Sequence, residues 1–366
     1  MIFILYIPFF VYLIIWGALL LGYLKLSKRK TITLDEDLSI TIVIPFRNEL
    51  LRWNNLLKAL KNLDDTNSDL MIIFINDHSD DGSFEFLKKW ISSFNKKNML
   101  LDLPENMHGK KMAIEYGVNH AKTRWIFTLD ADSHIAPNFL NDFESNLQKG
   151  KQMYLLPVSE FGRGFFLSSI EASILASITY SCLGCNKPLL ANGAGIIYDR
   201  NLFLELDPYK SNYNLPSGDD LFLLEKVVAH NRSLIAGFNQ KELNVYTTPP
   251  SSYKEMIFRA VRWATKMKSV NNKASFFVGG IVVLCNLTLI PICCYHLLNS
   301  NLISLLFILF SKFFFDVLLL SLNKNFSFSF NSVVKVTLTY LFYPFHLLIV
   351  LACSIFRTTN WKGRSI

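Results

Sequence analysis

The chain has 366 residues, of which 51% are hydrophobic and 18% charged, and its formal net charge is +8. Soluble domains usually have about 100 to 200 residues and about 25% charged ones, so these values exclude a single soluble globule and indicate a partly membrane-embedded protein. The basic residues are scattered rather than gathered in a stripe with aromatic neighbours, which argues against nucleic acid as a partner.

The first predicted element is an apolar segment at residues 1–24, which contains no charged residue and is followed by four basic residues within 25–30. About 20 apolar residues suffice for a helix to cross a membrane. A signal peptide would instead carry positive charge before its apolar run and a small-residue cleavage site after it. We therefore predict an uncleaved transmembrane anchor at 1–24, and its basic flank places the following domain, residues 25–273, in the cytoplasm.

Three apolar, strand-like runs alternate with helical patterns in the first part of this domain. SITIVIPF from Ser39 precedes RNE, LMIIFI from Leu70 precedes NDHSDDGS, and RWIFTL from Arg124 precedes DADS. Alternating strands and helices predict an α/β domain with a mostly parallel sheet. Because ligands bind beyond the carboxyl ends of the strands in such sheets, we expect the three polar clusters to form one site.

Two carboxylates, Asp130 and Asp132, follow the third of these strands. A lone Asp at such a position is usually a turn residue or a helix cap. Two carboxylates two residues apart in an extended chain repel each other, and a divalent cation removes this repulsion. Their hard oxygen atoms suit Mg²⁺ or Mn²⁺, which often bridges carboxylates to substrate phosphates. We therefore predict a metal site at Asp130 and Asp132.

A second acidic pair, Asp219 and Asp220, begins an apolar helical run in the segment LPSGDDLFLLEK. Acidic residues at a helix start are favourable for structure alone, because they face the positive end of the helix dipole. One of the two can also act as a general base that takes a proton from an acceptor hydroxyl. On the residues alone, both interpretations remain open.

Three further segments of the domain have less specific patterns. The apolar stretch at residues 164–184 lacks a basic polar face, which favours a core helix over one that lies at the membrane surface. Cys182 and Cys185 form a C-x-x-C pair without the second pair that a zinc site needs. The small residues of NGAGIIYDR, from Asn192, fit either a tight turn or a backbone that lies close to a ligand.

The C-terminal region, residues 274–356, is predicted to form transmembrane or interfacial helices, because it contains apolar stretches at 274–298, 302–322 and 333–356. Three full spans would place the basic tail, residues 357–366, outside the cell, against the usual distribution of positive charge. We therefore expect 302–322 to be re-entrant or interfacial. Its Lys312 and Asp316 are four residues apart, so a helix would bring them together as an ion pair that faces protein rather than lipid.

The order of the motifs supports a family resemblance. IPFRNE, INDHSDDGS, GKK, LDAD, NGAGIIYDR and SGDDLFLLEK, over roughly residues 38–270, resemble the motifs of the family 2 glycosyltransferases with the GT-A fold. The resemblance implies a Rossmann-like α/β domain for nucleotide-diphospho-sugar transfer, flanked here by transmembrane helices. It also implies a UDP- or GDP-sugar donor and a Mg²⁺ or Mn²⁺ cofactor.

The resemblance implies roles for four residues in binding the donor. Pro45 and Glu49 match the first nucleotide-binding turn of the family, and Asp77 matches its nucleobase contact. Lys110, which follows Gly109, stands where the family reaches towards the nucleotide or the diphosphate.

For the acidic pairs, the resemblance implies that Asp132 is the principal metal ligand and that Asp130 lies near the ribose and the metal. It also places the catalytic base at Asp220 and gives Asp219 a supporting role. With a base and no covalent sugar intermediate, the acceptor oxygen attacks the anomeric carbon directly and the configuration inverts.

A further match lies just before the C-terminal apolar stretches. Membrane-bound members of the family have a Gln-x-x-Arg-Trp motif that closes over the diphosphate, and FRAVRWATK matches it at Arg262 and Trp263. Arg262 suits a diphosphate and Trp263 suits stacking on a sugar, although a basic juxtamembrane helix is the other interpretation. Arg259 stands where the family has Gln, which weakens any prediction of polymer synthesis.

The leading hypothesis is an inverting glycosyltransferase of the cell inner membrane that moves one sugar to a lipid-linked, polysaccharide or other amphipathic acceptor. A processive polysaccharide synthase is the nearest alternative, but the few spans and the altered Gln-x-x-Arg-Trp motif do not favour a polymer channel. A non-catalytic membrane assembly subunit is the third, and the full set of acidic motifs argues against it.

Overall fold

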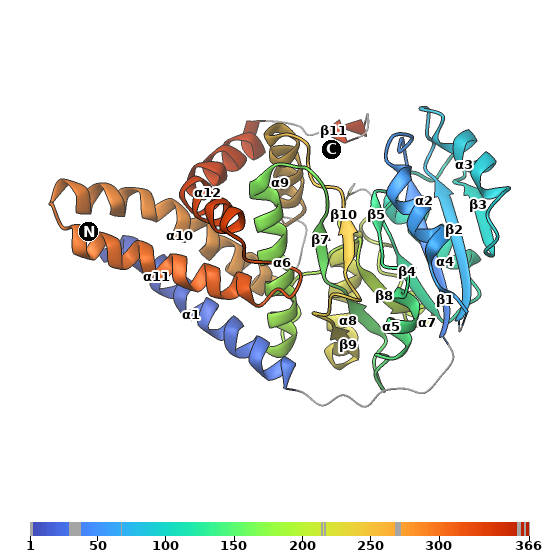
Figure 1. Ribbon diagram of the computed structural model, residues 1–366, viewed down its shortest axis with the longest axis horizontal. Helices are drawn as coiled ribbons and strands as arrows, with labels where there is room; N and C mark the ends of the chain where they lie inside the picture. The colour runs from blue at the N-terminus through green and yellow to red at the C-terminus, as the bar shows by residue number, and fades with distance from the viewer. Residues whose placement is uncertain are drawn as a thin grey trace. The chain divides into compact units, whose positions relative to one another are not determined.

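The computed structural model describes residues 3–28, 38–66, 68–213, 215, 217–267, 272–356, 360–361 and 364–365. It divides into two compact units. We call one the helical unit, which comprises Met1–Arg29, Arg163–Leu190 and Pro249–Thr359. We call the other the sheet unit, which comprises Lys30–Gly162, Ala191–Thr248 and Asn360–Ile366. Arg163–Leu190 and both ends of the domain predicted at 25–273 fall in the helical unit, and the bounds of that domain remain a prediction. Figure 1 shows the helices and strands of both units.

The sheet unit is built on a seven-stranded sheet in the order β3-β2-β1-β4-β8-β6-β9. Its strands are β1 (Leu38–Phe46), β2 (Ser68–Asn76), β3 (Asn98–Asp102), β4 (Trp125–Thr128), β6 (Met153–Leu155), β8 (Ile196–Asp199) and β9 (Ile235–Gly237). The pairs among β3, β2, β1 and β4 are parallel, whereas β8 is antiparallel to both β4 and β6. The sheet is thus mixed. The strands predicted from the alternating pattern, β1, β2 and β4, all lie in its parallel half.

The smaller elements of this unit complete the fold. A three-stranded sheet has the order β5-β10-β7, formed by β5 (Ser133–His134), β7 (Val158–Glu160) and β10 (Val245–Thr247). The helices are α2 (Trp53–Asn62), α3 (Ser83–Ile91), α4 (Lys110–His120), α5 (Phe139–Glu144), α7 (Arg200–Leu206), α8 (Asp219–Asn231) and the 3₁₀ helix η1 (Arg232–Leu234). The short strands β11 (Asn360–Trp361) and β12 (Arg364–Ser365) pair near the C-terminus.

The strand β1 is mostly apolar and almost wholly buried because both faces of the sheet are covered there. Ile40, Ile42 and Ile44 point to the face that shares one core cluster with Trp53 and Leu56 of α2. The helix α4 contacts β1 and β2 as well. Burial on both faces explains why the strand pattern in the sequence is continuous rather than alternating, and it leaves the carboxyl end of β1 as the place for polar residues.

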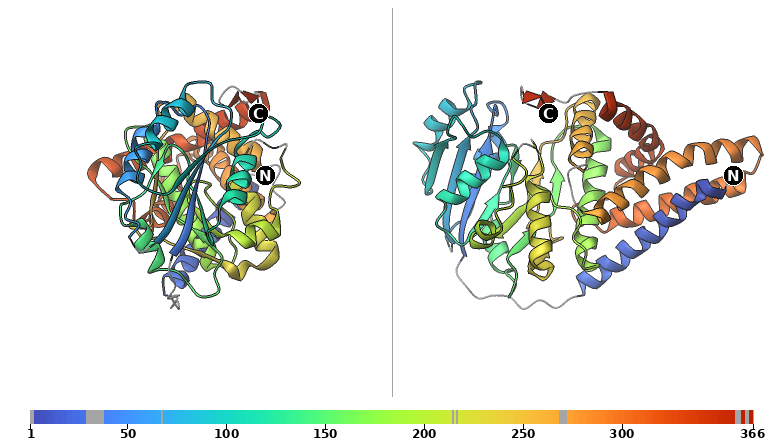
Figure 2. Two further views of the ribbon diagram at one scale, coloured as in Figure 1. Left: turned by 90° about the vertical axis from the view of Figure 1, so that its right-hand side faces the viewer. Right: turned by 180° about the vertical axis from the view of Figure 1, so that it is seen from behind.

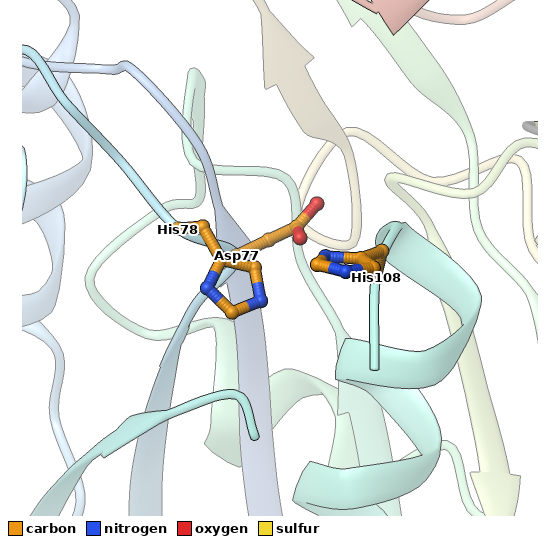
Figure 3. A group of neighbouring side chains, drawn as sticks. All are labelled: Asp77, His78 and His108. Carbon is orange, nitrogen blue, oxygen red and sulfur yellow. The ribbon is translucent and has the colours of Figure 1, made fainter. Parts of the chain in front are cut away.

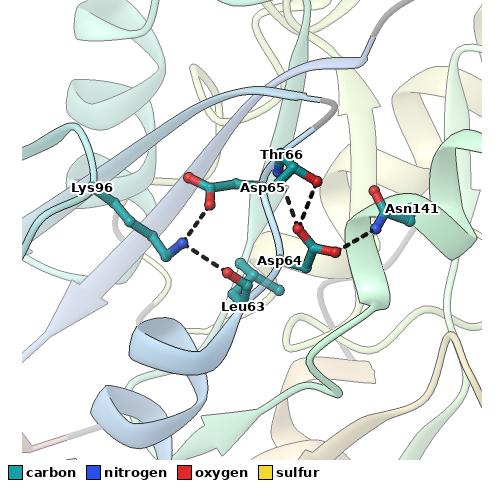
Figure 4. Close-up of polar contacts among 6 residues, drawn as sticks. All are labelled: Leu63, Asp64, Asp65, Thr66, Lys96 and Asn141. Carbon is teal, nitrogen blue, oxygen red and sulfur yellow. Dashed lines mark hydrogen bonds and ion pairs between the residues drawn. The ribbon is translucent and has the colours of Figure 1, made fainter.

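The turn after α2 is held by a local set of polar contacts (Figure 4). The backbone N–H and the hydroxyl of Thr66 donate to Oδ1 of Asp64 at 3.1 and 2.8 Å, and Asn141 donates to its Oδ2 at 2.9 Å. Lys96 donates to the carbonyl of Leu63 at 2.7 Å and to Oδ1 of Asp65 at 2.5 Å. These carboxylates are structural and lie outside the predicted site.

Asp64 is expected to make part of the stability depend on pH. The hydrogen bonds from Thr66, first from its backbone and then from its side chain, hold the pKa of Asp64 below its ordinary value. A depressed pKa stabilises the folded state above the unfolded value of about 3.9, and the effect is lost as the pH falls through the folded pKa. The difference in unfolding midpoint between wild type and Asp64→Asn should therefore shrink below about pH 4.

Thermal unfolding followed by tryptophan fluorescence from neutral to acid pH measures this difference. The control is Asp69→Asn, which removes an exposed carboxylate paired with Lys97 and should shift the midpoint little at any pH. A constant difference for Asp64→Asn at all pH values would contradict the interpretation.

The helical unit consists of α1 (Phe3–Ser27), α6 (Phe166–Gly184), α9 (Tyr253–Met267), α10 (Lys273–Leu298), α11 (Leu302–Ser321) and α12 (Phe330–Phe356). Within it, α1, α10 and α11 run alongside one another (Figure 2). Among the described residues, five helices are long and apolar enough to cross a membrane, namely α1, α6, α10, α11 and α12. Many large apolar side chains of α1, α10, α11 and α12 are exposed, as expected for helices surrounded by lipid.

The helix α6 is a core helix, as the sequence favours, but its core is that of the helical unit rather than that of the sheet. It crosses α1 so closely that a Cβ atom at Gly22 would lie 2.4 Å from the carbonyl of Ser181. A Cβ atom at Gly184 would lie 1.8 Å from the carbonyl of Gly22. Small residues at helix contacts are typical of membrane proteins. Cys185 lies at the same contact and donates to the carbonyl of Ala18 at 3.3 Å, which indicates packing.

The ion pair predicted within residues 302–322 is present. Nζ of Lys312 lies 2.6 Å from Oδ2 of Asp316, and the Lys312 residue is 3% exposed. Tyr12 of α1 donates to the other oxygen of this carboxylate, and the Lys312 ammonium lies over the rings of Tyr12 and Tyr340. The pair therefore faces protein, and it joins α11 to α1 and α12.

Removing one partner of this pair should be costly, whereas removing both should not. Lys312→Met leaves the Asp316 carboxylate without its cation and is expected to lower the free energy of unfolding by about 3 to 5 kcal/mol. Lys312→Met combined with Asp316→Leu should recover most of this loss, because an apolar pair needs no charge compensation. Thermal unfolding in detergent measures both, with Lys335→Met at an exposed position of α12 as the control. Equal destabilisation by the single and the double variant would contradict this account.

Candidate active site

The loops that follow β1 and β2 are bound to each other. Arg47 donates to the carbonyls of Asp77 and His78 at 2.8 and 2.7 Å. The backbone N–H of Glu49 donates to Oγ of Ser83 at 2.8 Å. The motifs RNE and NDHSDDGS, which lie about thirty residues apart in the sequence, therefore form one rigid edge of the site.

Asp77, the predicted nucleobase contact, follows β2 directly and is 3% exposed. Its backbone N–H donates to the carbonyl of Phe46 at 2.9 Å, and its Oδ1 accepts from the N–H of Gly109 at 3.1 Å. Pro45 and Glu49 are buried beside the same strand ends. The residues predicted for the first nucleotide-binding turn and for the nucleobase thus meet at one sheet edge.

Two histidines beside Asp77 were not predicted from the sequence. His78 and His108 have ring centroids 4.7 Å apart, and with Asp77 they form a group whose potential metal-ligand atoms lie within 4.8 Å of one another (Figure 3). Nε2 of His78 lies 3.0 Å from the carbonyl of Met107. An imidazole set suits transition metals rather than Mg²⁺, so this group differs in chemistry from the predicted carboxylate site. The sequence places His78 next to Asp77, but it contains no signal that brings His108 to them.

The carboxylates of Asp130 and Asp132 have different partners. Oδ1 of Asp130 lies 2.7 Å from Nζ of Lys110, whereas Oδ2 of Asp132 lies 3.9 Å from the guanidinium of Arg52. Their side chains are 34% and 25% exposed, so both can be reached from solvent. Two accessible carboxylates offer hard oxygen ligands to a divalent cation, which would compete with Lys110 and Arg52 for them. The prediction of Asp130 and Asp132 as its ligands remains a prediction.

The second acidic pair begins α8 and is more deeply buried. Asp219 and Asp220 are each 8% exposed. Oδ2 of Asp219 lies 2.8 Å from Nζ of Lys110, and Oδ1 of Asp220 accepts from the N–H of Leu221 at 2.8 Å. Tyr209 donates to the carbonyl of Asp219 at 3.2 Å. One ammonium group therefore contacts both the strand end at Asp130 and the helix start at Asp219.

The segment NGAGIIYDR supplies a close backbone approach at this point. A Cβ atom at Gly193 would lie 2.7 Å from Oδ2 of Asp219 and 3.0 Å from Nζ of Lys110. Gly193 thus leaves room for the ion pair. The N–H of Gly195 donates to the carbonyl of Asn192 at 2.9 Å, so the segment forms the tight turn of the first interpretation. The end of the segment forms β8.

Arg262 and Trp263 lie on α9, in the helical unit. In the same helix, Arg259 lies over the ring of Trp263 at 5.0 Å and donates to Oγ of Ser168 at 2.5 Å. The residue that departs from the family motif therefore contacts α6 and the tryptophan. Diphosphate binding by Arg262 and sugar stacking by Trp263 remain predictions.

Comparison with known proteins finds a family match over part of the chain. The family described as glycosyl transferase family 2 matches residues 41–188. A protein of Bacillus subtilis (strain 168) named uncharacterized glycosyltransferase YkcC is 27% identical over 141 residues, which are 38% of this chain and 43% of that relative. The chain thus matches less than half the length of this relative.

One solved structure shares the fold over nearly the whole chain. The mannosyltransferase PcManGT from Pyrobaculum calidifontis, in complex with GDP-Man and Mn²⁺, matches with a TM-score of 0.56 at 14% identity, over 96% of this chain and 99% of that one. S. aureus TarS matches with a TM-score of 0.44 at 16% identity, over 68% of this chain and 43% of that one. The chain is therefore similar to the family 2 glycosyltransferases over residues 41–188, and it has the GT-A fold.

Proposed function

We propose that this protein is an inverting glycosyltransferase that moves one sugar from a UDP- or GDP-sugar to a lipid-linked or amphipathic acceptor at the membrane. The observation that carries the proposal is the convergence of Asp130 and Asp219 on Lys110 within a family 2 domain. It brings the end of β4, where the donor is expected, next to the start of α8, which carries the predicted base.

The acidic pair on α8 supports the proposed chemistry. Asp220 takes the proton of the acceptor hydroxyl as that oxygen forms a bond to the anomeric carbon. The bond between the anomeric carbon and the diphosphate oxygen breaks, and the nucleoside diphosphate leaves with the electron pair. Because the acceptor enters opposite the leaving group, the configuration at the anomeric carbon inverts. No residue needs to form a covalent bond to the sugar.

Asp132, and Asp130 beside it, would hold Mg²⁺ or Mn²⁺. When bound, the cation neutralises the charge that develops on the departing diphosphate. PcManGT was solved with GDP-Man and Mn²⁺, which supports the same classes of donor and cation here. Pro45, Glu49 and Asp77 line the end of the site proposed for the nucleotide.

The helical unit supports a membrane location for the reaction. Its five long apolar helices are consistent with membrane association. The basic flank after α1 supports a cytoplasmic catalytic domain at the inner membrane, where nucleotide sugars are available. An acceptor with a lipid or amphipathic part would be held at that surface, close to the catalytic domain.

Incubating the purified protein in proteoliposomes with radiolabelled UDP- and GDP-sugars and Mn²⁺ tests the proposal. We expect label from one donor in the lipid-extractable fraction, and its loss when a chelator removes the metal. Label that grows into polymer would instead favour a processive synthase. Label in neither fraction with any donor would overturn the proposal and favour a non-catalytic subunit.

A further inference from the structure

Lys110 connects two parts of the sheet unit that have different tasks in the proposed reaction. It is the first residue of α4, and its Nζ lies 2.7 Å from Oδ1 of Asp130 and 2.8 Å from Oδ2 of Asp219. Asp130 follows β4 at the donor end of the site, while Asp219 directly precedes the predicted base, Asp220. A single ammonium group therefore joins a strand end to a helix start about ninety residues away in the chain.

The surroundings make this double contact strong. The side chains of Lys110 and Asp219 are 21% and 11% exposed, so water screens their charges poorly. The ammonium keeps two carboxylates together that would otherwise repel each other.

The backbone around the contact is shaped to accept it. Gly193 has no side chain, and a Cβ atom there would crowd both Oδ2 of Asp219 and Nζ of Lys110. Tyr209 holds the first turn of α8 from another direction through its hydrogen bond to the carbonyl of Asp219. The position of Asp220 thus depends on how this turn is held, and an error of about 1 Å in a catalytic group can cost about 100-fold in rate.

We propose that Lys110 is a positioning residue that ties the donor-side strand end to the first turn of α8 and thereby holds Asp220 in place for the acceptor. This goes beyond the donor contact implied by the family, in which a lysine would act on donor affinity alone. The effect on catalysis through Asp220 rests on the proposed function, whereas the contacts of Lys110 with Asp130 and Asp219 belong to the folded sheet unit.

A double-mutant cycle of Lys110→Met and Asp219→Asn distinguishes the two roles. Lys110→Met should lower kcat about 100-fold with little change in donor affinity, because it leaves two carboxylates to repel each other and shifts the first turn of α8. Adding Asp219→Asn removes the repulsion, so the double variant should recover about tenfold relative to Lys110→Met. Lys110→Arg keeps the charge and should retain most of the activity.

The unfolding midpoints of the same four proteins, measured without donor, test the link between Lys110 and Asp219 separately from catalysis. The control cycle is Lys97→Met with Asp69→Asn, an ion pair of 2.7 Å in the same sheet unit whose side chains are 73% and 56% exposed. It should show no coupling. If Lys110 and Asp219 are coupled in the unfolding midpoint but the wild type transfers no sugar, the structural link between them is supported and the proposed function is wrong. Independent effects in both kcat and midpoint, or a Lys110→Met defect that lies wholly in donor affinity, would overturn the positioning role.

Discussion

Asp220→Asn is expected to lower kcat by roughly 10²- to 10⁴-fold while the donor still binds as in the wild type. The side-chain amide cannot take the proton of the acceptor hydroxyl. It has the shape of the carboxylate, however, and its Oδ1 can still accept the hydrogen bond from the N–H of Leu221 that the wild type makes at 2.8 Å. The start of α8 is therefore preserved, and the loss should report chemistry rather than folding.

Steady-state kinetics together with donor binding by calorimetry measure this separation. The control, Asp207→Asn, makes the same change at a carboxylate near the end of α7. The Asp207 side chain is 43% exposed, and its Oδ2 lies 3.9 Å from Nζ of Lys210, a long contact, so the change should leave kcat unchanged. Near wild-type transfer by Asp220→Asn would remove the residue from the role of base. A loss that appears only in donor affinity would instead place Asp220 in the donor site.

The second large effect is expected at Asp132. Asp132→Asn removes one negative charge from the proposed cation site, and stabilisation of the leaving group by a metal ion is worth several kcal/mol. Since each 1.4 kcal/mol corresponds to a factor of ten, transfer should fall by roughly 100-fold or more, together with the affinity for Mn²⁺ and for the donor. Asp130→Asn should weaken Mn²⁺ binding less, because Asp130 also pairs with Lys110 at 2.7 Å.

Titration of Mn²⁺ into each variant, followed by its paramagnetic resonance signal, gives the affinities directly. Asp69→Asn, which alters an exposed carboxylate of the same sheet unit, serves as the control and should bind as the wild type does. If Asp132→Asn binds Mn²⁺ normally, or if Asp130→Asn loses more affinity than Asp132→Asn, the assignment of the principal ligand is wrong.

The half of the fold that carries the proposed donor site is largely predictable from the sequence. The runs that become β1, β2 and β4 are apolar because both faces of the sheet are covered, and each ends in polar residues at the same sheet edge. The ion pair of Lys312 and Asp316 is equally local, since four residues on a helix set their distance. These features depend on neighbours in the sequence.

Other features depend on contacts between distant segments and could not be predicted in the same way. The place of α6 in the helical unit follows from its contact with α1 at Gly22 and Gly184, and its own composition fits either unit. The antiparallel strand β8 interrupts the parallel order, and nothing in its sequence, IIYD, signals this direction. The double contact of Lys110 joins Asp130 and Asp219, which no local pattern brings together.

The most direct test of the central claim is the anomeric configuration of the product, measured by nuclear magnetic resonance after transfer by the purified full-length protein. With an α-linked nucleotide sugar as donor, direct attack by an acceptor that has lost its proton to Asp220 predicts a β-linked product. An α-linked product would show retention of configuration and would contradict the mechanism.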